Sequence, residues 1–291
     1  MTIQYPTPTW NRLIRFISTD GRVLLGEPVD GELDIGLAMS SGQTIEAHVL
    51  GGKHAWEATA VRTGKTALVQ TLLSPISQTE CPTIRCTGLS YKDHADELGL
   101  PHPKAPVLFF KPNTALNGPN ATVRVPKTAQ NEDLDYEVEL AVVIGRDCRD
   151  VSEEDAPDYV LGYTCANDLT SRQHQGVTSQ WGYCKGFDGF CPLGPVMVSH
   201  RSLPDPHVVK LQTRVNDHLV QNGAAEKMIF SIPHVISYLS QGSTLPAGSV
   251  IITGTPPGIG VSQTPPLWLK DGDEVRCWIS HGVGTLAIDV R

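Results

Sequence analysis

The sequence lacks any long apolar run, and this absence limits the kinds of protein that it can encode. No stretch approaches the roughly 20 apolar residues that a transmembrane helix requires, and the first residues do not follow the pattern of a signal peptide. Clusters of Lys and Arg are also missing, and the net charge is -8. Nucleic acids and anionic membranes are therefore poor partners. We expect a small molecule instead.

Several familiar cofactor and nucleophile motifs are missing as well. The seven cysteines are odd in number and form no C-x-x-C pair, so neither a disulfide framework nor a zinc ribbon is indicated. The stretch 253–260 matches neither the dinucleotide-binding pattern nor the P-loop, and Pro256 and Pro257 remove N–H donors that a phosphate site would use. The sequence around Ser90 lacks the second glycine of a nucleophile elbow. These absences argue against zinc, nucleotide and serine-hydrolase sites.

Two arginines near the N-terminus bear on location. Arg12 and Arg15, without early acidic residues, are compatible with a mitochondrial leader. The apolar and polar pattern of residues 12–18 instead predicts a first strand. We therefore expect a cytoplasmic protein with reduced thiols, with a mitochondrial location as the alternative.

The chain has 291 residues, of which 40% are hydrophobic and 19% charged, which suits one large or two unequal domains. Short alternating runs occupy residues 12–50, and Thr19-Asp20-Gly21 marks a hairpin between the first two. The character of the sequence changes near Thr83. We predict a small β-rich N-terminal domain over residues 1–78, without chemistry of its own, and a catalytic domain over residues 79–291.

The larger domain is predicted to contain many short strands and few helices. One helix is expected over residues 91–98, where a proline-rich loop follows and suggests a mobile lid. Another is expected over residues 153–159, and Ser231 is expected to cap a third. The expected strands cover residues 83–89, 107–111, 134–144, 160–165, 208–215, 218–221, 249–253, 273–280 and 285–290. This pattern predicts a β-rich α+β sandwich or roll rather than a doubly wound parallel sheet.

Two glutamates in one predicted strand are the first candidates for a site. In a strand, Glu137 and Glu139 point to the same side. Two carboxylates side by side in an apolar run are costly unless a cation lies between them. Asp168, which follows the predicted strand ending near Cys165, is the best third ligand. Three carboxylates suit Mg²⁺, Mn²⁺ or Ca²⁺ and not zinc or copper. A solvated strand face with Asp168 as a helix cap explains the same spacing equally well.

Three further residues extend this hypothesis. Three carboxylates exceed a divalent ion by one negative charge, and Lys185 could neutralise that charge or hold an anionic substrate. His94 and Glu97 lie three residues apart on the predicted lid helix. A carboxylate beside an imidazole orients it and raises its basicity, as the activation of water requires. A surface ion pair worth a few tenths of a kcal/mol explains the same spacing.

Six motifs, taken in order, resemble those of the fumarylacetoacetate hydrolase (FAH) superfamily. They cover the chain from about Thr83 to the C-terminus. The small N-terminal domain and the stretch 265–275 further resemble the branch of FAH domain-containing protein 2. The motifs are GLSYKDHADE at 88–97, FFKP at 109–112, DYEVE at 135–139, ND at 167–168 with Arg172 and Gln175, KGFDGFCPLGP at 185–195 and TGTPPG at 253–258.

The resemblance implies an FAH-type mixed β-sandwich roll, usually a homodimer. It implies Mg²⁺ or Mn²⁺ held by the positions of the three carboxylates, with His94 as the general base and Glu97 as its partner. The other site positions that it implies are Lys185, which we expect to be catalytic together with His94 and Glu97, and four substrate-binding residues: Lys111, Arg172, Gln175 and Thr255.

Residues and resemblance together suggest an enzyme that acts on a 2-oxo acid or 1,3-dicarbonyl compound through an enolate bound to the metal. The pair of His94 and Glu97 favours hydrolytic cleavage of a C–C bond in an acylpyruvate-type substrate. Decarboxylation or keto–enol tautomerisation of oxaloacetate are the alternatives, and the branch resemblance points towards the tautomerase. A non-catalytic ligand-binding protein on the same fold is the alternative from a different class.

Overall fold

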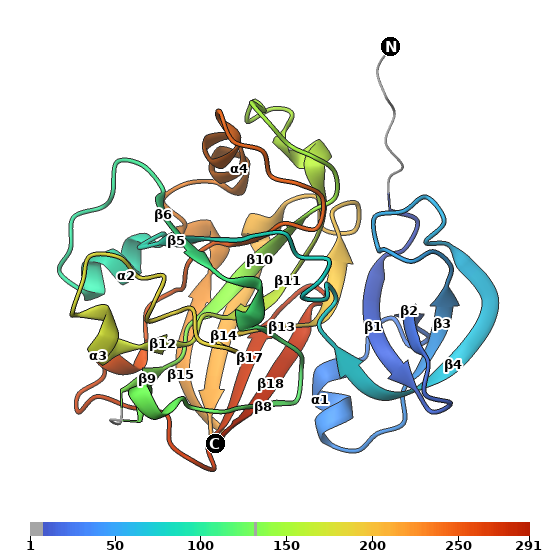
Figure 1. Ribbon diagram of the computed structural model, residues 1–291, viewed down its shortest axis with the longest axis horizontal. Coiled ribbons are helices and arrows are strands. Elements are labelled where there is room, and N and C mark those ends of the chain that lie inside the picture. The colour runs from blue at the N-terminus through green and yellow to red at the C-terminus, as the bar shows by residue number, and fades with distance from the viewer. Residues whose placement is uncertain (1–7, 131–132) are drawn as a thin grey trace.

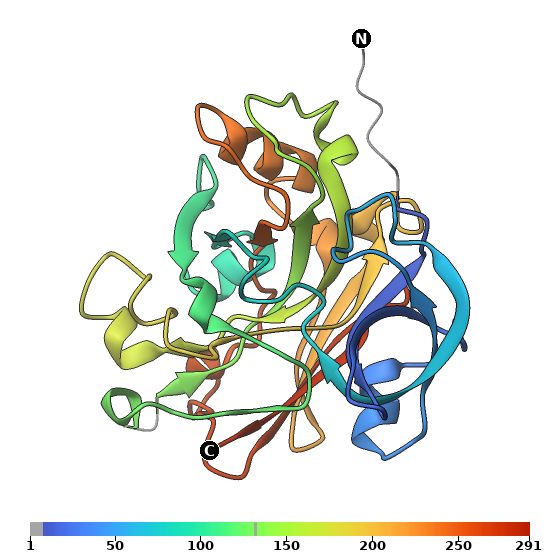
Figure 2. The same cartoon turned by 45° about the vertical axis from the view of Figure 1, so that its right-hand side comes forward.

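The computed structural model describes residues 8–130 and 133–291, so residues 1–7 of the expected N-terminal domain lie outside the described residues. The first four strands pair as β1–β2–β3–β4 and then back to β1, all antiparallel, which closes them into a ring (Figures 1 and 2). The predicted first strand and the hairpin after it are confirmed. These strands are β1 (Arg12–Ser18), β2 (Val23–Pro28), β3 (Glu46–Leu50) and β4 (Arg62–Leu73).

The ring is joined to the main body through β1, which also pairs with β13 at Arg12 and Leu13. From β13 the sheet continues in the order β11-β10-β16-β5-β6, and β7 adds to β13. Neighbours are antiparallel except for β16 with β5 and β7 with β13. The domain boundary near residue 78 remains a prediction. The strands are β5 (Ile84–Gly88), β6 (Val107–Lys111), β7 (Leu116–Asn117), β10 (Val138–Ile144), β11 (Val160–Asn167), β13 (Cys191–Ser199) and β16 (Val250–Ile252).

A second sheet, in the order β15-β14-β17-β18-β8, packs against the first (Figure 1). Its predicted hairpin is confirmed, because Asn216 and Asp217 both have positive φ, as a tight turn of this kind requires. β9 and β12 form a separate two-stranded antiparallel sheet. The bounds are β8 (Ala121–Val123), β9 (Leu134–Asp135), β12 (Thr170–Ser171), β14 (Lys210–Val215), β15 (His218–Ala224), β17 (Glu274–Ile279) and β18 (Gly284–Val290).

The central strand β10 is buried on both faces. Leu140 and Val142 belong to the core between the two sheets, whereas Ala141 and Val143 belong to a second core on the outer face of the large sheet. This alternation follows from the period of two in a strand. The prediction of a β-rich α+β fold is confirmed.

The helices are few and short. Ser231 caps α4 by accepting a hydrogen bond from the His234 N–H at 3.2 Å, as predicted. The helix predicted over residues 153–159 is wrong: the structure has only a 3₁₀ turn at Ala156–Tyr159, because β11 begins directly after it. The α-helices are α1 (Ile35–Ser40), α2 (Lys92–Glu97), α3 (Arg172–Gln175) and α4 (Ile232–Ser240). Over residues 8–130 and 133–291, no helix has the length and apolarity to cross a membrane.

The continuous strand predicted over residues 134–144 is wrong at one point, since β10 begins at Val138 and Glu137 precedes it. The side chain of Asn167 takes the place of a backbone partner here, and its Oδ1 accepts from the Glu137 N–H at 3.1 Å. The Glu137 carbonyl accepts from the Asp168 N–H at 2.8 Å. These bonds bring the end of β11 beside Glu137, so the interruption positions the candidate site.

Candidate active site

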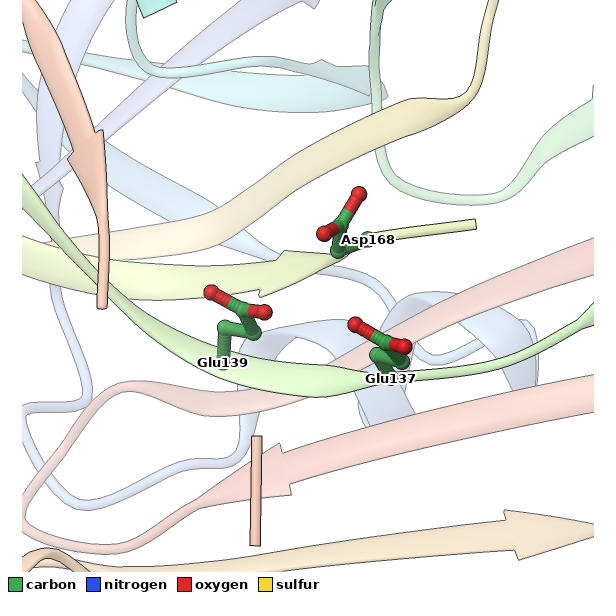
Figure 3. Close-up of side chains that lie close together, drawn as sticks. All are labelled: Glu137, Glu139 and Asp168. Carbon is green, nitrogen blue, oxygen red and sulfur yellow. The ribbon is translucent and has the colours of Figure 1, made fainter. Parts of the chain in front are cut away.

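The structure brings the three predicted carboxylates together. Glu139 lies near the start of β10, Glu137 directly precedes that strand, and Asp168 directly follows β11. All three side chains project from the same side of the sheet (Figure 3). One oxygen from each lies within 4.8 Å of the others. The exposed fractions are 6% for Glu137, 2% for Glu139 and 0% for Asp168. A solvated strand face is therefore excluded.

Glu137 is held as a carboxylate by two cations. Arg172 donates to its Oε1 at 2.6 Å and Lys185 to its Oε2 at 2.9 Å. Burial alone would raise the pKa of Glu137, but Lys185 and Arg172 outweigh burial and lower the pKa to about 2. Glu137 is therefore charged at neutral pH.

Lys185 links two of the carboxylates. Its ammonium donates to Glu137 at 2.9 Å, to Asp168 Oδ2 at 2.7 Å and to Thr170 Oγ1 at 2.8 Å, which uses all three of its protons. Burial acts to lower the pKa of Lys185, yet Asp168 and Glu137 hold it above its ordinary value. The structure therefore places a permanent positive charge at this position.

Asp168 is paired with a second buried lysine. Lys111 Nζ lies 2.7 Å from Asp168 Oδ1 and also donates to the backbone carbonyls of Leu169, Lys185 and Phe190. Its side chain has no exposed surface. Lys111 was expected to contact the substrate, but these four oxygens enclose its ammonium. Asp168 does not cap a helix.

Glu139 differs from the other two carboxylates. Its Oε2 accepts from the Gly254 N–H at 2.6 Å, but no basic side chain among the described residues forms an ion pair with it. Burial, together with the charges of Asp168 and Glu137, raises the pKa of Glu139 well above its ordinary value. A buried carboxylate that faces two others and lacks a cation fits a site for a hard divalent ion, since all three offer oxygen ligands.

His94 and Glu97 form the predicted pair on α2. His94 Nδ1 lies 3.1 Å from Glu97 Oε2, and the His94 side chain is 7% exposed, which excludes a simple surface ion pair. Glu97 is itself fixed, because its Oε1 accepts from the Gly258 N–H at 3.0 Å and from Ser262 Oγ at 2.8 Å. The pair thus fastens α2 to the loop after β16 and leaves Nε2 of His94 as the nitrogen available for proton transfer.

A cavity of about 480 Å³ joins the carboxylates to His94. Arg172, Lys185, Gln175 and Thr255 also line it, so the structure brings together all but two of the predicted site residues at one surface. The two exceptions do not line the cavity but contact residues that do: Glu97 contacts His94, and Lys111 contacts Asp168. The remaining lining is mostly apolar.

Asp135 is a residue of the site to which the sequence pattern assigned no role. It is fully buried and accepts from Arg172 Nε at 2.7 Å and from the N–H groups of Gly260 and Val261 at 2.6 and 3.0 Å. Arg172 thus forms ion pairs with both Asp135 and Glu137. Burial acts to lower the pKa of Arg172, but these two acids outweigh burial and raise it. Arg172 also donates to Gln175 Oε1 at 2.9 Å. The position of Asp135 in the DYEVE motif was the available signal.

Gln221 on β15 is a second residue that the sequence analysis missed. Its Nε2 donates to Thr255 Oγ1 and to the Pro256 carbonyl, each at 2.8 Å. Its Oε1 accepts from the Val138 N–H at 3.0 Å and from Thr213 Oγ1 at 2.8 Å. Gln221 thereby fixes the loop of Thr255 to the start of β10. No local pattern could show this, since the partners are distant in sequence.

Gln221→Leu is expected to destabilise the protein, because its partners would be left buried without hydrogen bonds. Each unsatisfied group costs about 1–3 kcal/mol, so the free energy of unfolding, measured by urea denaturation, should fall by at least that amount. Gln212→Leu is the matched control, since its side-chain bond to Asn222 is exposed. Equal midpoints for the two variants would contradict this role of Gln221.

Fold and site together define a class: a β-rich enzyme with a buried carboxylate cluster beside an imidazole–carboxylate pair. Residues 83–291 match the family described as Fumarylacetoacetate (FAA) hydrolase C-terminal. The chain belongs to the fumarylacetoacetate hydrolase family, and the predicted resemblance is confirmed.

Similar proteins include several members of this family. Caffeoylpyruvate hydrolase of Neonothopanus nambi is 42% identical over 288 residues, covering 97% of this chain and 94% of the relative. The mitochondrial oxaloacetate tautomerase fahd2 of Xenopus laevis is 43% identical over 212 residues, covering 72% of this chain and 65% of the relative. Among solved structures, 2-hydroxyhepta-2,4-diene-1,7-dioate isomerase from Mycobacterium marinum superposes with a TM-score of 0.79 at 35% identity, covering 97% of this chain and 98% of that one.

Proposed function

We propose that the chain is a metal-dependent enzyme that cleaves a C–C bond of an acylpyruvate-type substrate with water, releasing pyruvate and a carboxylic acid. The observation that carries this proposal is that one cavity is lined both by the cluster of three buried carboxylates and by His94, whose Nδ1 is paired with Glu97. The similarity to a caffeoylpyruvate hydrolase over nearly the whole chain supports it.

Glu137, Glu139 and Asp168 would hold the cation, for which we propose Mg²⁺, with Mn²⁺ or Ca²⁺ as alternatives. When bound, the ion would act as a Lewis acid that polarises the substrate oxygens. Lys185 and Lys111 hold Asp168 in place through ion pairs with its two carboxylate oxygens. We assign Lys111 this positioning role because its ammonium is enclosed.

His94 would act as the general base. Its Nε2 takes a proton from a water molecule whose oxygen adds to the acyl carbonyl carbon, while Glu97 holds Nδ1. The bond between that carbon and the methylene carbon then breaks, and its electron pair remains on the pyruvate fragment. His94 returns the proton to the methylene carbon. The sum is substrate plus water giving pyruvate and a carboxylic acid.

Other residues of the cavity would orient the substrate. Thr255 and Gln175 each present a polar side chain to the cavity and are fixed from behind, by Gln221 and Arg172 respectively. The bonds of Glu97 to Gly258 hold α2 over the site and help to exclude bulk water. We include a homodimer and a cytoplasmic location in the proposal as expectations.

A second candidate activity is the tautomerisation or decarboxylation of oxaloacetate, which the similarity to the Xenopus tautomerase favours. In this case His94 would only move a proton between carbon and oxygen of the substrate, or β-carboxylate would be lost as CO₂. The same residues would bind the 2-oxo acid.

Product analysis by NMR, with oxaloacetate and acetylpyruvate in the presence of Mg²⁺, distinguishes these activities. We expect acetylpyruvate to give equal amounts of acetate and pyruvate. Pyruvate and CO₂ from oxaloacetate, or faster keto–enol exchange with the carbon skeletons intact, would assign the second candidate instead. A protein that only binds these compounds would change neither of them.

A further inference from the structure

The cavity of the candidate site has a charged half and an apolar half, and only the charged half is used by the proposed chemistry. All charged residues that line it belong to the carboxylate cluster and its neighbours. The apolar lining includes Phe109, Trp181 and Ile259. Pockets of about 300–1,000 Å³ enclose drug-sized ligands, so a cavity of about 480 Å³ has more room than a four-carbon oxo acid needs.

Phe109 marks the boundary between the two halves. Lys185 Nζ lies 5.2 Å from the centre of its ring, which is within the range of a cation–π contact. The ring of Trp181 meets Phe109 edge-on, with centroids 5.4 Å apart and an interplanar angle of 72°. The order Lys185, Phe109, Trp181 therefore runs from the charged end towards the apolar end.

The ring of Trp181 packs directly against the backbone of Gly88, where only glycine leaves enough room for it. A Cβ at Gly88 would lie 2.2 Å from Cζ3 of Trp181 and 2.9 Å from Cη2, so any larger residue would displace the ring. The backbone also fixes Trp181 relative to the charged half, because its carbonyl accepts from the Lys185 N–H at 3.1 Å. Trp181 and Lys185 thus belong to the same turn of the backbone.

Apolar side chains at the rim of the cavity are unusually accessible. Leu98, Leu100, Val107 and Val261 all line the cavity, and their exposed fractions lie between 38% and 48%. Exposed apolar side chains that gather around a pocket commonly mark a surface that a ligand covers. A substrate with a charged dioxo head and an apolar tail would match both halves.

We propose that the apolar half binds an aromatic acyl group of the substrate, and that Gly88 and Trp181 determine the preference for aromatic over short aliphatic acyl groups. This inference rests on the proposed function, because the charged head must lie at the carboxylates. An aromatic tail is favoured over an aliphatic one because the rings of Trp181 and Phe109 offer edge-to-face and stacked contacts.

The test compares kcat/KM for benzoylpyruvate with that for acetylpyruvate. We expect the wild-type enzyme to prefer benzoylpyruvate at least tenfold and Trp181→Ala to lower this ratio by about 10-fold or more, as for other losses of apolar pocket contacts. Gly88→Ala should lower the ratio in the same direction by displacing the ring. The double variant should have the same ratio as Trp181→Ala alone, since both changes remove the same contact between the Trp181 ring and the substrate.

Controls separate this role from a structural one. Trp181→Phe keeps an aromatic ring and should retain part of the preference, even if Trp181→Ala folds poorly. Tyr183→Ala removes an exposed aromatic side chain two residues away that does not line the cavity, and should leave the ratio unchanged. If Gly88→Ala and Trp181→Phe both keep the wild-type ratio of kcat/KM for benzoylpyruvate to that for acetylpyruvate, the inference is overturned.

A binding measurement keeps this inference distinct from the proposed function. Isothermal titration calorimetry of both compounds with the His94→Asn variant and Mg²⁺ compares affinities without rapid turnover. The inference is supported if the His94→Asn variant binds benzoylpyruvate more tightly than acetylpyruvate and the additional change Gly88→Ala abolishes this difference. That result would hold even if the wild-type protein cleaves neither compound and the proposed function fails. Equal affinities for the two compounds overturn the inference, even if both are cleaved.

Discussion

Replacement of Glu139 by glutamine is expected to abolish the stabilisation of the protein by Mg²⁺. In the wild-type protein, an ion present at about one hundred times its Kd would add about 2.7 kcal/mol to the free energy of unfolding, and Tm should rise by several degrees. Glutamine has the same shape but removes the buried charge of Glu139, which forms no ion pair with a basic side chain of residues 8–130 or 133–291. Thermal unfolding after chelation, with and without added Mg²⁺, measures the effect.

The metal-free Glu139→Gln protein should also be at least as stable as the metal-free wild type, because glutamine removes the cost of burying an unpaired carboxylate. The pH dependence provides a second test. Since the pKa of Glu139 is raised on folding, the folded state binds this proton more tightly than the unfolded chain. The metal-free wild type should therefore lose stability as pH rises from the ordinary Glu value through the raised pKa, and Glu139→Gln should reduce this loss.

The matched control is Glu27→Gln in the N-terminal ring. Glu27 is equally a buried glutamate, but it already has a cation, since Arg62 Nε lies 2.7 Å from its Oε2. This variant should lower stability and leave the Mg²⁺-induced rise in Tm intact. If Glu139→Gln kept the full rise, the carboxylate cluster would not be the metal site.

His94→Asn is expected to lower kcat by about 10²–10⁴-fold, the usual contribution of a general base. Asparagine retains a polar side chain of similar size but cannot take a proton from water. The rise in Tm with Mg²⁺ should persist, because His94 is not among the three carboxylates. Steady-state kinetics with acetylpyruvate, together with the thermal measurement, separates loss of chemistry from loss of the metal.

A second histidine close to α2 provides the control for this prediction. His102 lies in the loop after α2 and contacts Asp96, but it is 44% exposed and does not line the cavity. His102→Ala should therefore retain nearly full activity. Similar activities for His94→Asn and the wild type would remove His94 from the mechanism.

Local patterns in the sequence predict much of the fold. Short apolar-rich runs predict the strands Arg12–Ser18 and Val107–Lys111 at their observed bounds. Turn and cap residues predict the hairpin at Asn216 and the start of α4 at Ser231. Each of these signals depends on neighbours within a few residues. The break before Val138 escapes such patterns, because it depends on the side chain of Asn167 in another strand.

The candidate site divides in the same way. Chemistry that requires particular residue types is visible in the sequence: the carboxylates, Lys185 and the i,i+3 pair of His94 and Glu97. Contacts that position these residues are not visible, because they join segments far apart in the chain. Gln221, for example, reaches Val138 across 83 residues. The enclosed ammonium of Lys111 likewise depends on carbonyls that only the folded chain brings together.

The most direct test of the central claim is the product stoichiometry of acetylpyruvate before and after Mg²⁺ is restored to chelator-treated enzyme. The carboxylate cluster and the His94–Glu97 pair predict no cleavage without the ion, and equal amounts of acetate and pyruvate once it is added. Cleavage at the same rate without a divalent ion, or an intact carbon skeleton in its presence, would contradict the claim.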